Sequence, residues 1–441
     1  MRFWIERHGC AKNDVDGEEI AARLEAAGHA YAQGPAEAEL VIVNTCGFIE
    51  AAKKESIEAV IGIKAAYPGK RVLVAGCLSQ RYAAQLAADL PEADGLVGNA
   101  DLGAVLAAAE ATMAGERPVV MPEAAPSIGT VRRARRFDYP GTAHVKATEG
   151  CSNFCSFCAI PLIRGRLRSR PVDEVLAECL DLAAQGAREL VLIGQDLGSY
   201  GRDLSGGDSL LPELLAALSD SEGDFRVRVL YIHPDHFPEG ILPVMAADAR
   251  LLPYLDLPFQ HGSERVLRAM NRRGGGEAYL GLLDRVRKAM PDAAIRSTFL
   301  VGFPGESDED FEELLEFQKS ARLDWVGSFA YSREDGTAAY DLRGLPSKRV
   351  VAARRSALEE AQERITRERL GRFLGRELEV LVEEEVERAS ADEEELSLGR
   401  AWNQAPDVDG LTVLRGRHEP GALVRARIVG VNGVDFDALP V

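Results

Sequence analysis

The chain has 441 residues, a formal net charge of −18, 46% apolar residues and 28% charged residues. This length predicts two to four domains, and the composition is that of an ordinary globular protein. The acidic balance disfavours nucleic acid as a partner, because proteins that grip nucleic acid usually carry a basic surplus. No apolar run approaches the roughly 18 residues of a membrane span. The first residues, MRFWIERHGC, lack the apolar stretch of a signal peptide, so we expect a cytoplasmic protein without membrane contacts.

Strands and helices alternate over residues 1–114. Apolar segments at 2–7, 40–45, 71–76 and 95–98 predict strands, and the amphipathic segments between them predict helices. Strands separated by helices of this length indicate a parallel sheet that is covered on both faces. We therefore predict a flavodoxin-like parallel-sheet domain at the N-terminus.

Residues 115–142 interrupt the alternation. They are rich in proline and carry a short basic run of Arg132, Arg133, Arg135 and Arg136. We predict a linker here. A solvated connector is favoured over a ligand site for the basic run.

The alternation resumes from residue 143. Six strand segments separated by helical segments lie between His144 and about Ser332, which predicts a partial barrel whose working face is at the carboxyl ends of the strands. A charged helical connector, 346–370, ends this core of residues 143–370. The periodicity of residues 371–441 then changes to two, which predicts a small antiparallel β-barrel. The fold class is thus α/β with a C-terminal β-barrel.

Seven cysteines in a long chain without a secretory signal favour metal or redox chemistry over disulfides. Cys151, Cys155 and Cys158 follow the first strand of the core, where a loop can place three thiolates around an iron–sulfur cluster. Three ligands on a four-iron cluster leave one iron open to a small molecule. A zinc site would need a fourth ligand, but His144 and Cys179 lie too far away, and Cys179 is predicted to be a packed core residue.

A second set of cysteines is far apart in sequence. Cys10, Cys46 and Cys77 each follow a predicted strand of the N-terminal sheet. Because parallel strands end at one edge, the three thiols should meet at the carboxyl edge, where open α/β sheets bind ligands. The alternative is three separate buried cysteines at strand ends.

Polar residues also follow the strands of the predicted core barrel. Gln195 and Asp196 end one strand, Gln260 and His261 end another, and a GFPGE turn from Gly302 ends a third. Residues in these positions face the active site in barrel folds. The glycines of the turn allow the backbone to approach a bound nucleoside closely.

Four arginines alternate directly after the core cysteines, at Arg164, Arg166, Arg168 and Arg170. Arginine makes paired hydrogen bonds to carboxylates, so these residues could hold the carboxylate of a ligand. Structural ion pairs are an equally good interpretation.

The three-thiol spacing of the core, with an aromatic residue at Phe157, resembles the radical S-adenosylmethionine (SAM) superfamily. Segments such as HGCAKNDVDGEE, VIVNTCGFIEAAKKESI, EGCSNFCSFCAIPLIRGRLRSRP and TFLVGFPGESDEDFEELLEF extend the resemblance to the methylthiotransferases of that superfamily, over essentially the whole chain. The resemblance implies two 4Fe–4S clusters, one on each cysteine triad, and SAM at the open iron of the core cluster. It implies SAM contacts by Phe157, Gln195, Gln260 and Gly302, and no catalytic residue beyond the clusters. It also implies a cluster domain at 1–114 and a TRAM domain, an OB-like barrel, at 371–441.

The segment YLDLPFQHGS, with His261, resembles the protein-modifying branch of the methylthiotransferases. That branch adds a methylthio group to the β-carbon of an aspartate in small-subunit ribosomal protein twelve. The resemblance implies this partner, free or on the ribosome, together with an unidentified electron donor and an unidentified sulfur source. Residues 372–441 hold eight Arg, no Lys and fifteen Asp or Glu, a formal charge of −7 that suits a basic protein and disfavours nucleic acid as the substrate.

The resemblance also implies the chemistry, in which a carbon radical from SAM removes a hydrogen from the β-carbon. Sulfur from the N-terminal cluster then joins that carbon, and a second SAM supplies the methyl group. Two alternatives stay open at this point. One is a tRNA adenosine methylthiotransferase, and the other is a non-catalytic two-cluster electron carrier.

Overall fold

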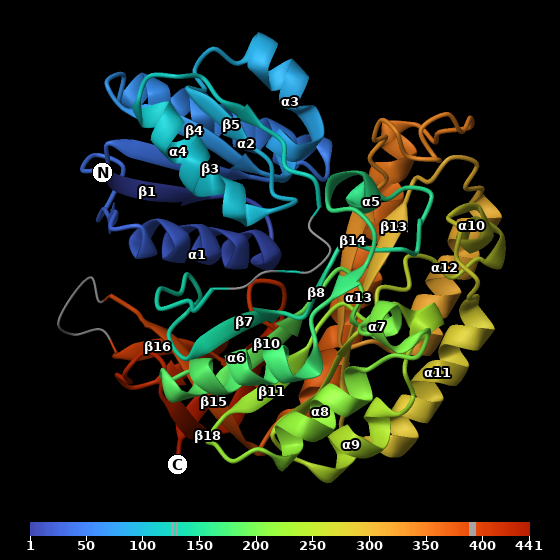
Figure 1. The fold of residues 1–441 in the computed structure, drawn as a ribbon. Coiled ribbons are helices and arrows are strands. Elements are labelled where there is room, and N and C mark those ends of the chain that lie inside the picture. The colour runs from blue at the N-terminus through green and yellow to red at the C-terminus, as the bar shows by residue number, and fades with distance from the viewer. Residues whose placement is uncertain (125–127, 129–130, 388–393) are drawn as a thin grey trace.

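The computed structural model of the chain describes residues 1–124, 128, 131–387 and 394–441. These residues form three units, built on two six-stranded sheets and one closed barrel (Figure 1). Among them, no helix combines the length and the apolar character that crossing a bilayer requires.

The N-terminal unit is a parallel sheet with helices on both faces. In sheet order its strands are β2 (Ala30–Tyr31), β1 (Arg2–Arg7), β3 (Leu40–Thr45), β4 (Arg71–Gly76), β5 (Gly95–Val97) and β6 (Val119–Val120). Its helices are α1 (Ala11–Ala26), α2 (Glu50–Ala66), α3 (Cys77–Asp89) and α4 (Val105–Met113), the last preceded by the turn η1 (Leu102–Ala104). Every strand pairing is parallel, as the sequence predicts.

The alternation of side chains along the strands decides which helix covers which face. Ile42 and Leu73 pack with α1 and α4, whereas Val41 and Val72 pack with α2 and α3 on the opposite face. The helix α1 also lies on the side of this unit that faces the core (Figure 1).

The core is a second parallel sheet of six strands. In sheet order they are β14 (Trp325–Ala330), β13 (Ala294–Val301), β12 (Leu251–Asp256), β11 (Arg226–Val229), β10 (Glu189–Ile193) and β7 (Thr142–Lys146). The main helices that cover it are α6 (Val172–Ala184), α8 (Leu211–Asp220), α9 (Ile241–Ala247), α10 (Glu264–Ala269), α11 (Gly276–Ala289) and α12 (Asp308–Ala321). Short elements fill the loops at the carboxyl ends: β8 (Thr148–Glu149), α5 (Ile160–Ile163), β9 (Arg168–Ser169), η2 (Leu197–Ser199), α7 (Arg202–Ser205) and η3 (Pro234–His236). The predicted six βα units are confirmed.

The helix α13 (Lys348–Leu370) and the turn η4 (Gly371–Phe373) connect the core to the C-terminal barrel. The barrel strands are β15 (Glu377–Glu385), β16 (Leu396–Ala401), β17 (Thr412–Arg415), β18 (Leu423–Asn432) and β19 (Asp435–Pro440). The strands close in the order β15-β16-β17-β19-β18. Four pairings are antiparallel, and β17 with β19 is parallel.

The barrel covers the face of the core sheet that the core helices leave open. Along β10, Leu190 and Leu192 pack under the helices, whereas Val191 and Ile193 share an apolar cluster with barrel residues. Polar contacts join the same two units: the Trp325 indole N–H donates to the carbonyl oxygen of Asn403 at 2.7 Å. The partial barrel is therefore closed by the C-terminal unit.

The segment between the first two sheets differs from the prediction of a solvated connector. Arg133 is 2% exposed and lies between Glu18 of α1 and Glu178 of α6, to both of which it is ion-paired. The prediction is wrong for this arginine, because two carboxylates from separate units converge on it. Val119 and Val120 add a short strand to the N-terminal sheet.

Candidate functional site: two cysteine triads

The first triad lies at the carboxyl ends of three neighbouring strands. Cys10 follows β1, Cys46 follows β3 and Cys77 follows β4. The backbone comes very close here, since a Cβ atom on Gly9 would lie 3.0 Å from the Cβ of Cys46, and one on Gly47 would lie 2.8 Å from the carbonyl oxygen of Cys77. The sheet thus brings Cys10, Cys46 and Cys77 to one edge.

Helices begin at two cysteines of this triad. Cys10 is the N-cap residue of α1, and Cys77 is the first residue of α3. The N-terminus of a helix favours negative charge, which a thiolate or an anionic cluster carries. Asn99 donates from its side-chain nitrogen to the Cys77 sulfur at 3.3 Å, while its buried oxygen has no hydrogen-bond partner among the described atoms.

The second triad lies on the loop after β8. The Cys151 N–H donates to the carbonyl oxygen of Gly165 at 3.1 Å, and the Cys158 N–H donates to that of Cys155 at 3.0 Å. Neighbouring loops hold this loop in place: the Asn153 amide nitrogen donates to Asp196 at 2.8 Å, and the Cys155 sulfur lies 3.9 Å from Nε2 of His233.

The N-terminal triad contacts the segment that follows the core triad. Cys77 packs in one apolar cluster with Ala159, the residue after Cys158, and with Ile163. Arg164, at the end of α5, donates from Nη2 to the Cys77 sulfur at 3.3 Å. A residue that follows the core cysteines therefore touches a cysteine of the N-terminal unit.

The arginines after the core cysteines divide between two roles. Arg164 is buried and ion-paired with Asp16 of α1 at 2.8 Å and with Glu149 at 2.7 Å. Arg170 is buried and ion-paired with Glu178. Arg166 instead lies over the ring of Phe154, 5.1 Å from its centroid. The structural interpretation holds for Arg164 and Arg170.

The donor atoms of both triads suit iron–sulfur clusters. Burial is the main cause that raises the pKa of Cys46, Cys151 and Cys158, each to about 12. Such thiols ionise when a metal ion binds them. Among the described residues, no trio of His, Cys, Asp or Glu is spaced to chelate a single metal ion. A cubane cluster takes each thiolate on a different iron, so its ligands lie farther apart.

The predicted SAM residues all lie at the carboxyl edge of the core sheet. Phe157 is half-buried against the core, and Gln195, after β10, donates to Glu149 at 3.3 Å. Gln260, after β12, is buried and has a φ of +68°, a left-handed conformation that is strained for this residue type. Gly302, after β13, has a φ of +78°, and a Cβ atom there would lie 2.6 Å from a methyl group of Val351. Glycine is thus required at 302 by the positive φ of its backbone and by the close approach of α13.

His261 does not face an open site. Its side chain is fully buried, and its Nδ1 accepts a hydrogen bond from the Ser263 N–H at 2.9 Å. Burial lowers the pKa of His261 to about 3, so the ring is neutral, with Nε2 lying 3.9 Å from Glu306. The expectation that His261 faces the active site is wrong, since the ring packs inside the core.

Several buried charges at the junction escaped sequence analysis. Lys146 of β7 is ion-paired with Asp16 and Glu149, and Lys12 of α1 lies over the ring of Tyr231, with Nζ 3.5 Å from the centroid. Lys12, Asp16 and Glu19 are spaced as one helix face, and all three are buried. The sequence does carry a signal for these residues, because charged residues at this spacing indicate one polar face of a helix.

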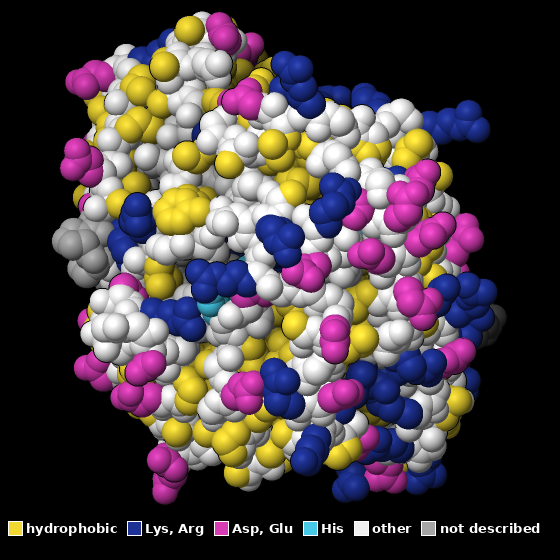
Figure 2. Space-filling model, turned by 90° about the vertical axis from the view of Figure 1, so that its right-hand side faces the viewer, with side chains coloured by type: hydrophobic (Ala, Val, Ile, Leu, Met, Phe, Trp, Pro, Cys, Tyr) yellow, Lys and Arg dark blue, Asp and Glu magenta, His cyan; other side chains and the backbone are white. Residues whose placement is uncertain are grey.

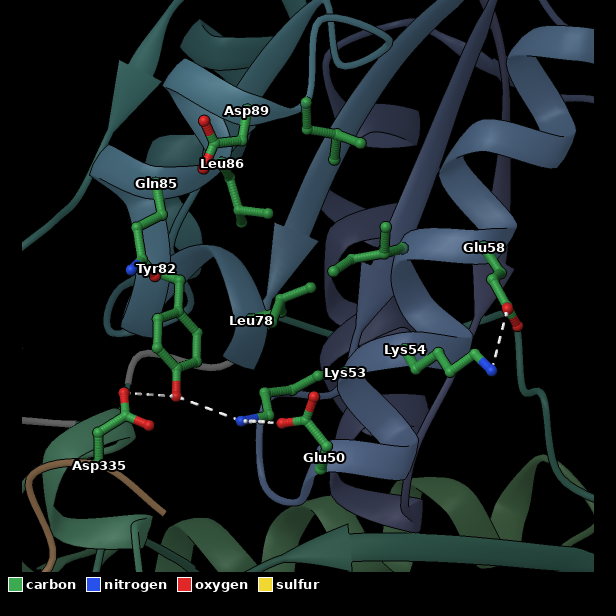
Figure 3. A pocket seen from close by; sticks show the side chains of 12 residues that line it. Glu50, Lys53, Lys54, Glu58, Leu78, Tyr82, Gln85, Leu86, Asp89 and Asp335 are labelled. Atoms are coloured by element: carbon green, nitrogen blue, oxygen red, sulfur yellow. Dashed lines mark hydrogen bonds and ion pairs between the residues drawn. The ribbon is translucent and has the colours of Figure 1, made fainter. Parts of the chain in front are cut away.

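Figure 2 shows Lys and Arg side chains around a hollow in which a histidine is visible, with acidic side chains interspersed over the same face. A separate cavity of about 580 Å³ lies between α2 and α3 (Figure 3). There Tyr82 donates to Asp335 at 3.0 Å, and Lys53 donates to the Tyr82 oxygen at 3.4 Å. None of the six triad cysteines is among the described residues that line this cavity.

The comparisons with known proteins agree with this architecture. Residues 145–317 match the radical SAM superfamily, residues 2–98 match the uncharacterized protein family UPF0004, and residues 374–441 match the TRAM domain. Among solved structures, the radical SAM methyltransferase TsrM from Kitasatospora setae, with cobalamin and a 4Fe–4S cluster bound, has a TM-score of 0.56. It is 16% identical and covers 77% of this chain and 76% of its own, which shows a shared fold.

Curated relatives align over nearly the whole chain. The ribosomal protein uS12 methylthiotransferase RimO of Treponema denticola is 45% identical and covers 99% of this chain and 100% of its own length. The enzyme of the same name from Moorella thermoacetica is 41% identical and covers 99% and 98%. Identity at this level and coverage fix the family. The chain belongs to the RimO family of radical SAM methylthiotransferases.

Proposed function

We propose that this chain adds a methylthio group to the β-carbon of an aspartate in ribosomal protein uS12. We propose further that Cys10, Cys46 and Cys77 hold one 4Fe–4S cluster and that the core triad holds the second. The observation that carries the proposal is the packing of Cys77 against Ala159, because it joins the two triads across one junction. A carbon to be activated at one cluster and sulfurated at the other must lie between them.

When bound, a reduced cluster and SAM would supply the chemistry that removes hydrogen from an unreactive carbon. The chain's own residues bind and shield this chemistry. Cys151, Cys155 and Cys158 bind the cluster, and Asp196 and His233 hold its loop. Phe157, Gln195, Gln260 and Gly302 form the proposed SAM contacts at the same edge. The C-terminal barrel covers the open side of the core sheet and so excludes water.

The proposed domain division follows these roles. Residues 1–114 form the cluster domain, 115–142 the connecting segment, 143–370 the radical SAM core with its helical connector, and 371–441 the TRAM domain. A ribosomal substrate places the enzyme in the cytoplasm. The electron donor and the sulfur source are separate partners.

Mass spectrometry of uS12 and of tRNA nucleosides tests the proposal, after incubation of the reconstituted enzyme with SAM, a reductant and a sulfide source. We expect the mass of a methylthio group on one aspartate of uS12. Methylthio-adenosine in tRNA with unmodified uS12 would favour the tRNA alternative, and the absence of SAM cleavage would favour the electron carrier.

Iron content tests the ligand assignment. The wild type should bind about eight irons per chain, as two four-iron clusters. Changing Cys10, Cys46 and Cys77 to Ala should leave about four irons and intact SAM cleavage, but no methylthio product. Changing the core triad to Ala should also leave about four irons, without SAM cleavage. A Cys179→Ala variant is the control, because this thiol is buried in the core away from both triads.

A further inference from the structure

Lys12 is a buried cation at the junction of the two triads. It lies two residues after Cys10, in the first turn of α1, and it is 7% exposed. Its ammonium group lies 3.5 Å from the centre of the Tyr231 ring, in the core unit. Tyr231 follows β11, between the strands that lead to Gln195 and Gln260. Lys12 therefore reaches from the N-terminal unit to the core unit.

The carboxylates near Lys12 already have cationic partners, and the charge that most favours its ammonium form is that of Cys10, a proposed cluster ligand. Glu149 is ion-paired with Arg164 at 2.7 Å and with Lys146 at 3.0 Å, and Asp256 is ion-paired with Arg296 at 3.2 Å. Over the described part of the chain, no carboxylate lies within 4 Å of the Lys12 ammonium group and no acceptor oxygen bonds to it.

Burying a cation is costly unless it is paired with an anion. An ammonium group has three donors, and the face of one ring satisfies them poorly. Tyr231 also has a φ of +61°, which is unusual for a bulky residue and typical of functional sites. Arg272, another buried cation near the core triad, differs because it donates to the carbonyl oxygen of Pro258. Lys12 is thus a buried ammonium group that no carboxylate of the described residues pairs.

We infer that Lys12 binds the side-chain carboxylate of the target residue and thereby selects aspartate. The inference rests on the proposed function, in which the β-carbon is modified and the neighbouring carboxylate is kept. A carboxylate on Lys12 would hold that β-carbon at the junction of the two triads. A neutral amide of the same shape would leave the ammonium group without its anion.

The test compares binding of uS12 with binding of a uS12 variant in which the target aspartate is asparagine. The holoenzyme, without reductant, is titrated with each form, and fluorescence anisotropy gives the affinity. The wild type should prefer the aspartate form. Lys12→Met should weaken binding of the aspartate form by about 10- to 100-fold and leave binding of the asparagine form unchanged, as loss of one charged hydrogen bond predicts. Lys12→Arg should retain most of the preference.

Two controls accompany the titrations. Lys54→Met removes an exposed lysine of α2 whose partner is Glu58, and it should bind both forms as the wild type does. The iron content of each variant shows that both clusters are loaded.

If Lys12→Met loses the same affinity for the aspartate and the asparagine forms of uS12, Lys12 has a structural role and the inference is overturned. If Lys12→Met keeps the preference for aspartate, the inference is also overturned. A change in the spectrum of the N-terminal cluster in that variant would not rescue it. These outcomes differ from failure of the proposed function, in which wild-type enzyme that cleaves SAM forms no methylthio product on uS12. In that case the inference about Lys12 fails as well.

Discussion

His144 and Asp138 form a buried pair where the connecting segment enters the core. Nδ1 of His144 lies 2.6 Å from the Asp138 carboxylate, and the backbone N–H of His144 donates to the same carboxylate at 3.0 Å. Burial alone lowers the pKa of a histidine and raises that of an aspartate. The attraction between the two groups outweighs burial, so the pKa of His144 is raised and that of Asp138 is lowered.

These shifts predict a stability that depends on pH. A raised histidine pKa contributes stability below the unfolded value of about 6.5, which is lost as pH rises through the folded value. A lowered aspartate pKa contributes above about 3.9 and is lost as pH falls through the folded value. Asp138→Asn should therefore lower the free energy of unfolding most between about pH 4 and 6.5, by about 2 kcal/mol.

Thermal unfolding of the apoprotein at several pH values measures this difference, with Asp173→Asn on the surface of α6 as the control. A difference between wild type and Asp138→Asn that stays constant up to pH 9 would show that His144 is not charged in the folded state.

At the scale of single residues, the sequence predicts a site only where the order of strands and loops along the chain decides which residues come together. Cys10, Cys46 and Cys77 follow parallel strands that end at one edge, and the core cysteines share one loop, so both groupings follow from sequence. The burial of Lys12, Arg133 and His261 depends on which surfaces meet. A charged residue alone does not reveal a partner that is more than a hundred positions away, as Glu18 is from Arg133.

Among the elements, α1 does the most to join the units. It begins at Ala11, with Cys10 as its N-cap residue. Asp16 receives ion pairs from two residues of the core, Arg164 and Lys146. One helix thus carries a proposed cluster ligand, the Lys12 ammonium group and the charges that fasten it to the core.

Removing Arg164 tests this junction. Arg164→Met should lower the free energy of unfolding by about 3 kcal/mol, because it leaves the carboxylates of Asp16 and Glu149 buried with one cation fewer. Urea unfolding of the apoprotein measures the effect, with Arg166→Met as the control. Arg166 lies two residues further along the chain, but it is exposed, and its guanidinium group lies over the Phe154 ring. Equal stability of the two variants would contradict a role for Arg164 in holding the units together.

Long elements were predictable and short ones were not. The six core strands and the four main strands of the N-terminal sheet have clear apolar patterns. The strands β2 and β6 have two residues each, too few for a period, and they exist because a neighbouring strand offers hydrogen bonds. Similarly, the parallel pairing of β17 with β19 follows from closure of the barrel, which a local pattern does not encode.

At the scale of the whole molecule, the acids of the C-terminal barrel differ in their surroundings. Not all of its acids are on the surface, since Glu383 is buried and ion-paired with Arg400, which also reaches Glu189 of the core. Reversing Glu383 would therefore damage the fold. Asp392 lies outside the described residues. Glu384, Glu387 and Glu394 are exposed, with Glu394 ion-paired to the exposed Arg415, and these three acids are called the acidic face.

The last prediction concerns this acidic face. Changing Glu384, Glu387 and Glu394 to Lys should slow methylthiolation of uS12 at low salt, because charge steering raises the encounter rate of opposite charges. The difference from wild type should vanish toward 1 M salt, where the screening length falls to about 3 Å. SAM cleavage without substrate should stay unchanged, since these residues lie on the barrel surface.

The matched control reverses the exposed Glu309, Glu312 and Glu316 of α12, which changes the net charge equally on a different face. If both triple variants slow the reaction alike, net charge and not the barrel steers the encounter. Faster modification of tRNA by the barrel variant, with unchanged modification of uS12, would contradict a basic protein substrate.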